Sequence, residues 1–199
     1  NGSLSPPPPS RTVVAMSDRP HGAPSGPLLV LSPHLDDAAL SCGALLARAE
    51  PLTVLDVFTQ RPEPEQVTDW DRRCGFRGSD EATAARWAEE QTAFADSAHH
   101  FTAVDLVDGQ YLSGPRDEAD AGRLRRMIDL WLQQVDGPAT IALPVGAGTP
   151  RGVSKSMLSR WRAKRGGTYA FDNSPDHLFV RDTALEHLRG RSPVTVLLY

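Results

Sequence analysis

Short apolar runs alternate with longer amphipathic stretches from Leu28 onward. The apolar runs have the length of strands, and the second is rich in β-branched residues; they cover 28–31, 52–58, 101–106, 140–143 and 194–199. Helical periodicity is found between the runs, over 38–49, 80–97, 119–134 and 174–189. Strands that alternate with helices form a mainly parallel sheet covered on both faces. The pattern therefore predicts a three-layer, Rossmann-like α/β fold.

Two stretches do not follow this alternation. Residues 60–79 contain Arg61-Pro62-Glu63-Pro64 and glycines near their end, which predicts a long loop. Residues 146–173 separate the fourth predicted strand from the last helix and include a basic, helix-capable stretch. Loops longer than about 12–15 residues inside a domain are usually functional or mobile. We therefore interpret 146–173 as an insertion.

The N-terminal segment differs from the rest in composition. Of the 17 prolines, 8 lie within the first 33 residues, with four in a row at 6–9. Such a segment is typical of an extended or disordered leader. We therefore divide the 199 residues into a leader, 1–26, and one domain, 27–199, that is long enough for a sizeable core.

Charge and composition argue against several classes of protein. A net charge of −4 argues against binding to nucleic acid or to a membrane surface. No run approaches the roughly 18 apolar residues of a membrane span, and the N-terminus lacks the apolar core of a signal peptide. We therefore expect a cytoplasmic protein. Its only cysteines, Cys42 and Cys74, are expected to be reduced thiols.

Chemically active side chains gather where the first predicted strand ends. His34, Asp36 and Asp37 lie between that strand and an Ala-rich helix. In α/β proteins, ligands bind at the carboxyl ends of strands. A histidine with one carboxylate can hold a metal, which leaves the other carboxylate to act on a water. The same aspartates would also satisfy backbone N–H groups at a helix start, so both explanations remain open.

A hydrolytic zinc site usually has three protein ligands and one open position. His34 and Asp37 are three residues apart, so both can reach one point from a first helical turn. The candidate for the third ligand is His177, because residues 174–177 again place an aspartate and a histidine at a helix start. That segment would begin a helix equally well without a metal. The other histidines lie in the leader, in a turn or within a helix: His21, His99, His100 and His187.

Two motifs and their order resemble a known family. Pro33-His34-Leu35-Asp36-Asp37 before an Ala-rich helix, with Pro175-Asp176-His177 later, is similar to the LmbE/PIG-L family of zinc-dependent de-N-acetylases. Residues 70–76 (WDRRCGF) and Arg86-x-x-Glu89 resemble small actinobacterial members. The similarity spans about 28–199. It implies an LmbE-like fold and removal of acetyl groups from N-acetylglucosaminyl substrates.

The resemblance also implies a role for each matching residue. His34, Asp37 and His177 correspond to the ligands of Zn²⁺ or another divalent metal. Asp36 corresponds to the general base that takes a proton from zinc-bound water. The substrate is expected to be a small amino sugar or glycoconjugate of secondary or thiol metabolism. Arg86 or Arg73 would bind its hydroxyl or carboxylate groups, although an arginine on a helix is usually a solvated charge.

The chain departs from the family pattern at Ser174. The family's second motif commonly reads His-Pro-Asp-His, and its first histidine steadies the oxyanion or protonates the leaving amine. Serine donates a hydrogen bond but is no cationic acid near neutral pH, and loss of such a donor costs about 10²–10³ in rate. Asp176, which supports that histidine in the family, would here be a helix-cap carboxylate. The candidates to replace the missing group are Tyr169, His99 and His100.

The 146–173 insertion is the second departure. It could be a lid that sets specificity, and its basic residues could attract a phosphorylated or nucleotide-linked sugar: Arg160, Arg162, Lys164 and Arg165. A solvated basic helix face would have the same composition.

Two other functions remain open. The serine at 174 could mark a degenerate family member that binds a metal or a sugar without turnover, as a partner subunit. Alternatively, Asp36, Asp37 and Asp56 could hold Mg²⁺ in a receiver-like phospho-acceptor domain. That function gives His34 and His177 no role. The identity of the substrate and the oligomeric state, including a homo-oligomer, do not follow from the sequence.

Overall fold

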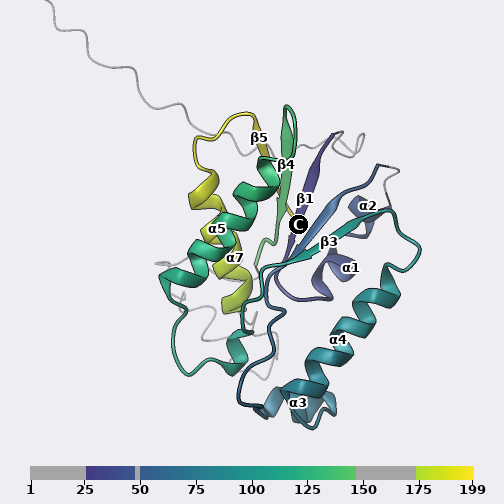
Figure 1. Ribbon diagram of the computed structural model, residues 1–199, viewed down its shortest axis with the longest axis vertical. Coiled ribbons are helices and arrows are strands. Elements are labelled where there is room, and N and C mark those ends of the chain that lie inside the picture. Colours follow the sequence, from purple (N-terminus) through teal and green to yellow (C-terminus); the bar gives the residue numbers. More distant parts are fainter. Residues whose placement is uncertain (1–25, 48–49, 147–173) are drawn as a thin grey trace, which may run out of the picture.

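The computed structural model describes residues 26–47, 50–146 and 174–199, which form an α/β structure (Figure 1). Five strands make one sheet in the order β3-β2-β1-β4-β5, and every neighbouring pair is parallel. The strands are β1 (Leu28–Ser32), β2 (Thr53–Asp56), β3 (His100–Ala103), β4 (Ala139–Leu143) and β5 (Val194–Leu198). The predicted class and parallel sheet are therefore confirmed.

The strand order also bears on the alternative functions. The order 3-2-1-4-5 is that of the doubly wound Rossmann sheet, whereas receiver domains have the order 2-1-3-4-5. The fold therefore disagrees with the receiver-like interpretation. β3 is shorter than the predicted strand at 101–106, but beyond it Gln60 and Val107 still form an isolated parallel bridge.

Helices lie on both faces of the sheet (Figure 1). The predicted helices at 80–97, 119–134 and 174–189 are confirmed to within a few residues as α4, α5 and α7. The helical elements are α1 (Asp37–Ser41), α2 (Gly43–Leu46), α3 (Asp69–Cys74), α4 (Ser79–Ala93), the 3-10 turn η1 (Gly109–Tyr111), α5 (Glu118–Leu132) and α7 (Pro175–Leu188).

Two predictions about helices were wrong. The single helix expected over 38–49 is, in its described part, two short helices that separate at Cys42, next to a glycine that weakens helix formation. The loop expected over 60–79 contains α3. Its signals were present in the sequence, because Thr68 and Asp71 form a capping box and Gly75 ends the helix with a φ of 86°.

The sheet buries a different cluster on each face. Along β1, Leu29 and Leu31 point to one face, while Leu28 and Val30 point to the other, as the pleat requires. The first face packs against α5 and α7 through Leu124, Ile128, Val180 and Ala184. The second packs against the α1–α2 segment through Ala38, Cys42, Leu45 and Leu46. The resulting three layers hold the carboxyl ends of the strands in fixed positions.

Some further predictions concern the whole chain. No helix of the described residues combines the length and the apolar character that crossing a membrane requires. Cys42 is buried, Cys74 is exposed, and both are free thiols, as expected. The predicted leader and insertion lie outside the described residues, except for Gly26 and Gly146.

Candidate metal centre

The carboxyl ends of β1 and β4 meet where the strand order reverses. From β1 the chain moves outward through β2 and β3, and it returns to β4 on the other side of β1. In such sheets the crevice at the switch point is where ligands bind. His34 follows β1, and His177 lies in the first turn of α7, the helix that precedes β5. The topology thus brings together two motifs that are distant in sequence.

Local hydrogen bonds fix the turn that carries the first motif. Ser32 Oγ donates to the His34 carbonyl at 2.5 Å and accepts the Ala38 N–H at 3.2 Å. The Asp37 carboxylate accepts the backbone N–H of His34 at 2.9 Å. Asp36 occupies the N-cap position of α1, but its exposed side chain makes no capping hydrogen bond. Capping therefore does not explain why an aspartate stands at position 36.

One carboxylate oxygen lies between two imidazoles. Asp37 Oδ2 is 3.1 Å from His34 Nδ1 and 3.1 Å from His177 Nε2, and the two ring centroids are 5.4 Å apart. One ligand atom from each residue lies within 4.8 Å of the others, and all three residues are partly buried. Two histidines and a carboxylate are an established ligand set for hydrolytic zinc. The three residues therefore fit a divalent metal ion.

His34 faces two further carboxylates through its other ring nitrogen. Its Nε2 is 3.4 Å from Asp176 Oδ2 and 3.8 Å from Asp108 Oδ2, and this group also has metal-binding spacing. Each carboxylate already has a cation, because Arg86 Nη1 is 3.1 Å from Asp108 and Arg116 Nη2 is 2.8 Å from Asp176. These arginines compensate the negative charge that would attract a metal. The pair is better suited to orienting His34, as carboxylates do behind metal-bound histidines.

No sequence motif pointed to Arg116, which is nearly buried and holds Asp176 in place. Its Nε and Nη2 donate to Asp176 Oδ1 at 3.1 and 2.8 Å, and its Nη1 donates to Asp120 at 3.3 Å. The guanidinium carbon lies 3.9 Å from the centre of the Phe58 ring. On the other side, the Gly109 N–H donates to Asp176 Oδ2 at 2.8 Å. Asp176 is therefore more than a helix-cap carboxylate.

Hydrogen bonds set the charges of the centre. Burial by itself lowers the pKa of His34, but hydrogen bonds with Asp176 and Asp37 outweigh it and raise that pKa to about 10. Burial by itself raises the pKa of Asp37, but hydrogen bonds with His177 and His34 outweigh it and hold that pKa well below its usual range. Since metal ligands are neutral imidazoles and ionised carboxylates, metal binding must displace the proton of His34.

Two buried carboxyl groups near the centre have no hydrogen-bond partner among the described residues. Asp56 ends β2 and is 1% exposed, and Glu90 on α4 is 4% exposed. Burial raises the pKa of Asp56 to about 7; the nearby Ser32 hydroxyl opposes this shift, and the negative charge of Asp37 adds to it. Burial, together with repulsion from Asp56 and Asp36, raises the pKa of Glu90 to about 8. Near neutral pH, Glu90 therefore keeps most of its proton and Asp56 is roughly half protonated.

The structure brings only some of the predicted residues to the centre. Arg86 reaches it through Asp108, whereas Arg73 is exposed on α3 and no described contact links it to the centre. Ser174 is the N-cap of α7, and its side chain makes no capping hydrogen bond. Asp56 belongs to none of the groups with metal-binding spacing in the described part of the chain.

The structure also describes some of the residues that were predicted to replace the missing histidine. His99 and His100 lie at the amino end of β3, the opposite end of the parallel sheet from the centre, so their assignment was wrong. His99 instead contacts the Leu46 carbonyl through Nε2 at 2.8 Å. His187 pairs with Asp129 at 2.9 Å, as a histidine within a helix often does. Outside the described residues lie Tyr169, Arg160, Arg162, Lys164 and Arg165.

Comparisons with known proteins do not identify a family for this chain. No family model matches the chain, and no curated protein matches it. The LmbE/PIG-L resemblance therefore rests on the two motifs and their order, and it stays a prediction. What the structure adds independently is an α/β fold with a metal-binding arrangement of His34, Asp37 and His177 at its switch point.

Proposed function

We propose that the chain is a zinc-dependent hydrolase that removes an acetyl group from an N-acetylglucosamine-type sugar or glycoconjugate. The observation that carries the proposal is the position of Asp37 Oδ2, 3.1 Å from one nitrogen of each of two histidines. These histidines come from the loop after β1 and from α7, and they meet in the crevice where such folds bind ligands. The motif resemblance supplies the substrate class.

In this proposal, different residues hold the metal, activate the water and orient a ligand. A divalent metal held by His34, Asp37 and His177 would polarise the acyl carbonyl and lower the pKa of a water. Asp36 adjoins a ligand and makes no capping hydrogen bond, so its carboxylate is available to take the proton of the attacking water. Asp176 and its neighbour Asp108 keep the His34 ring in the orientation that presents Nδ1 to the ligand group.

The leaving amine also needs a proton. Ser174 is no cationic acid, and Asp176 is paired with Arg116, whose guanidinium keeps its proton near neutral pH. Among the described residues, Asp36 is our candidate to return the proton it has taken from water to the nitrogen as the C–N bond breaks. One carboxylate then serves first as base and later as acid, and it ends the cycle ionised.

The first experiment measures metal content and turnover on the same sample. Elemental analysis of the purified chain should give about one zinc per chain, since no arginine of the described residues pairs with the carboxylate in the set of His34, Asp37 and His177. Acetate release from N-acetylglucosaminides should occur with zinc and stop with a chelator. Purified protein that binds no zinc would contradict the proposal.

The second experiment separates the base from the ligands. Asp36→Asn should retain zinc but lose about 10²–10⁴ in kcat, the usual contribution of a positioned base. His177→Ala should instead lose zinc. If Asp36→Asn kept full activity, Asp36 would not be the base.

A second candidate function is binding without turnover. It is favoured by one observation: the carboxylate that would support a catalytic histidine at position 174 is occupied by Arg116. A degenerate member would bind zinc stoichiometrically and bind an N-acetylated sugar, yet release no acetate. Combined zinc, calorimetric and acetate measurements distinguish the two functions.

A further inference from the structure

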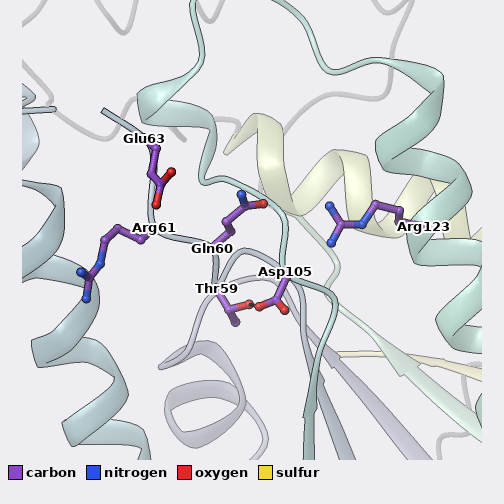
Figure 2. Close-up of a pocket in the computed structure, with 6 residues that line it drawn as sticks. All are labelled: Thr59, Gln60, Arg61, Glu63, Asp105 and Arg123. Atoms are coloured by element: carbon purple, nitrogen blue, oxygen red, sulfur yellow. Dashed lines mark hydrogen bonds between the residues drawn. The ribbon is translucent and has the colours of Figure 1, made fainter. Parts of the chain in front are cut away.

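The segment after β3 brings Asp108 to the metal centre along a firmly held path. Thr59 Oγ1 donates to Asp105 Oδ1 at 2.9 Å, and Figure 2 shows these two side chains beside each other in the polar hollow that they line. Further along, Gln60 and Val107 form a parallel bridge. The backbone is thus held up to the residue before the aspartate, so its carboxylate is placed by contacts of the side chain.

Asp108 is one of two carboxylates that face Nε2 of His34. That nitrogen is 3.4 Å from Asp176 Oδ2, within hydrogen-bond reach, but 3.8 Å from Asp108 Oδ2, which is beyond it. Nε2 carries at most one proton, so the two carboxylates are alternative acceptors. A change of acceptor would turn the ring, and Nδ1, which faces Asp37 at 3.1 Å, would turn with it. The position of Asp108 therefore bears directly on the ligand geometry.

The side chain of Gln110 keeps Asp108 at this distance. Gln110 Nε2 donates to Asp108 Oδ2 at 3.0 Å, and its backbone N–H donates to Oδ1 at 3.0 Å. Arg86 Nη1 also donates to Oδ2, at 3.1 Å. Arg86 compensates the negative charge, whereas Gln110 holds both oxygens and so fixes the direction of the carboxylate. Asp108 then acts on His34 by its charge, without accepting the ring proton.

The amide of Gln110 has one favourable orientation. A carboxylate only accepts hydrogen bonds, so Asp108 faces the NH₂ group, and Oε1 accepts from the Thr68 hydroxyl at 2.8 Å. That hydroxyl also has Asp71 Oδ2 within 2.9 Å. The Asp71 carboxylate already accepts the Thr68 N–H and the Tyr111 hydroxyl, each at 2.8 Å, so the proton is available for the amide. The N-cap of α3 thus fixes the amide.

We propose that Gln110 is a positioning residue of the metal centre. By holding Asp108 away, it leaves Asp176 as the acceptor for the ring proton of His34. That acceptor sets the direction in which Nδ1 faces a metal ion, and groups behind a metal-bound histidine typically change metal affinity 10–100-fold. The inference rests on the metal site of the function proposed above, but it does not depend on deacetylation.

The test measures metal binding to the full chain, with zinc and separately with Co²⁺, whose visible absorption reports the geometry of its ligands. Gln110→Met keeps the length of the side chain and removes its hydrogen bonds. We expect a zinc Kd raised at least about tenfold and a changed Co²⁺ spectrum. Two controls should keep both: Tyr111→Phe, which removes a hydrogen bond to Asp71 from the same 3-10 turn, and Gln134→Met, exposed after α5.

The controls separate positioning from general loosening. If Gln110→Met kept the wild-type Kd and spectrum, or if Tyr111→Phe changed them equally, the positioning role would be overturned. A double-mutant cycle then tests the path. In an Asp108→Ala background Gln110→Met should have little further effect on Kd, because the side chain that it holds is gone. Additive losses would mean that Gln110 acts by another route and would overturn the role.

A second pair of variants covers the case in which Gln110→Met does not fold. Thr68→Val removes the hydroxyl that orients the amide and should raise the zinc Kd, whereas Thr68→Ser keeps the hydroxyl and should retain the wild-type value. Equal Kd values in the two variants would overturn the role.

The outcomes also separate this inference from the proposed activity. If zinc binding responds to Gln110→Met as expected but no acetate is released, the deacetylase proposal fails and the positioning role stands. If acetate is released and Gln110→Met binds zinc as wild type does, the positioning role fails alone. Wild type that binds neither zinc nor Co²⁺ would overturn both.

Discussion

A single guanidinium pairs with the carboxylate that, by the family resemblance, would support an imidazole at position 174. Arg116 pairs with Asp176 at 2.8 Å and so provides the positive charge that a histidine at position 174 would otherwise bring to that carboxylate. It provides no transferable proton, since an arginine stays charged under all ordinary conditions. The electrostatic balance around Asp176 is therefore kept, while acid catalysis has to come from another group.

This arrangement predicts that Ser174→His by itself gives no gain in kcat. The new imidazole would need Asp176 as its partner, but Oδ1 of that carboxylate is bonded to Arg116 and Oδ2 to the Gly109 N–H. Steady-state kinetics should show a gain only when the competitor is removed, in Ser174→His/Arg116→Gln compared with Arg116→Gln. A rise in kcat for the single variant would contradict this account of Asp176.

Gly109 allows a close approach that no other residue type permits. A Cβ at this position would lie 2.6 Å from Asp176 Oδ1, and Arg116 prevents the carboxylate from moving aside freely. Gly109→Ala should therefore disturb the carboxylate behind His34 and reduce zinc affinity or activity by about 10–100-fold. Gly114→Ala is the control, because a Cβ there meets nothing within 4 Å. Equal effects of the two substitutions in zinc titrations would argue against the role of Asp176.

At the scale of elements, three helical elements place a polar group in the interior of the protein. α7 begins with buried Asp176, η1 presents a backbone N–H to it, and α4 buries Glu90. Asp176 is satisfied by the partners described above, whereas Glu90 and Asp56 of β2 have none among the described residues. Unpartnered carboxyl groups are tolerated in the interior because they can keep their protons.

The two buried acids predict that stability falls as pH rises. Their folded pKa values, about 7 for Asp56 and about 8 for Glu90, lie above the unfolded values near 4. Between about pH 4 and pH 8 the folded chain thus holds protons that the unfolded chain has released, and the linkage relation makes unfolding easier with rising pH. Asp56→Asn/Glu90→Gln should raise Tm at pH 8 and flatten its decline.

The measurement is thermal unfolding from pH 4 to pH 8 with a chelator present, so that metal binding does not contribute. Glu89→Gln, an exposed neighbour on α4, serves as the control and should follow the wild-type profile. A double variant whose Tm still declined as steeply as that of wild type would show that the protons are held elsewhere.

At the scale of the molecule, the ligand set ties together segments from both halves of the chain. His34 and Asp37 follow β1, near the start of the domain, and His177 lies in α7, near its end. A ligand that binds the folded state alone stabilises it by mass action. Metal binding here should therefore stabilise the whole α/β domain rather than one loop.

Zinc should raise Tm with the logarithm of its concentration once that concentration exceeds Kd. At 100 times Kd the gain is about 2.7 kcal/mol, or roughly 5–10 °C for a domain of this size. His177→Ala should lose most of this increase, whereas His100→Ala, exposed at the other end of the sheet, should keep it. An equal zinc response in both variants, measured by differential scanning fluorimetry, would remove His177 from the ligand set.

The features that sequence reasoning found are those with local signals. Apolar runs predicted the strands, and periodicity predicted α4, α5 and α7 because each must bury one face. His34, Asp37 and His177 were grouped since each stands where a helix begins, and parallel topology sends such turns to one rim of a sheet. The capping box at Thr68 is an equally local signal, and it marks the start of α3 in the segment that was predicted to be a loop.

The features that sequence reasoning missed depend on packing between distant segments. Arg116 has no motif around it, and its importance comes from Phe58 and Asp176 on other elements. By its sequence Glu90 resembles any solvated helix glutamate, but in the folded protein it is only 4% exposed. Asp108-Gly109 was the one detectable signal, since an acidic residue and a glycine follow the third strand at the functional rim.

The division of the sheet into two rims has a practical consequence. Every residue of the candidate metal centre lies beyond the carboxyl ends of the strands, whereas the turn at Gly137, between α5 and β4, is exposed at the amino ends. That turn offers a place for surface immobilisation or for a fused reporter domain, because a tether there would lie at the opposite end of the sheet from the metal centre.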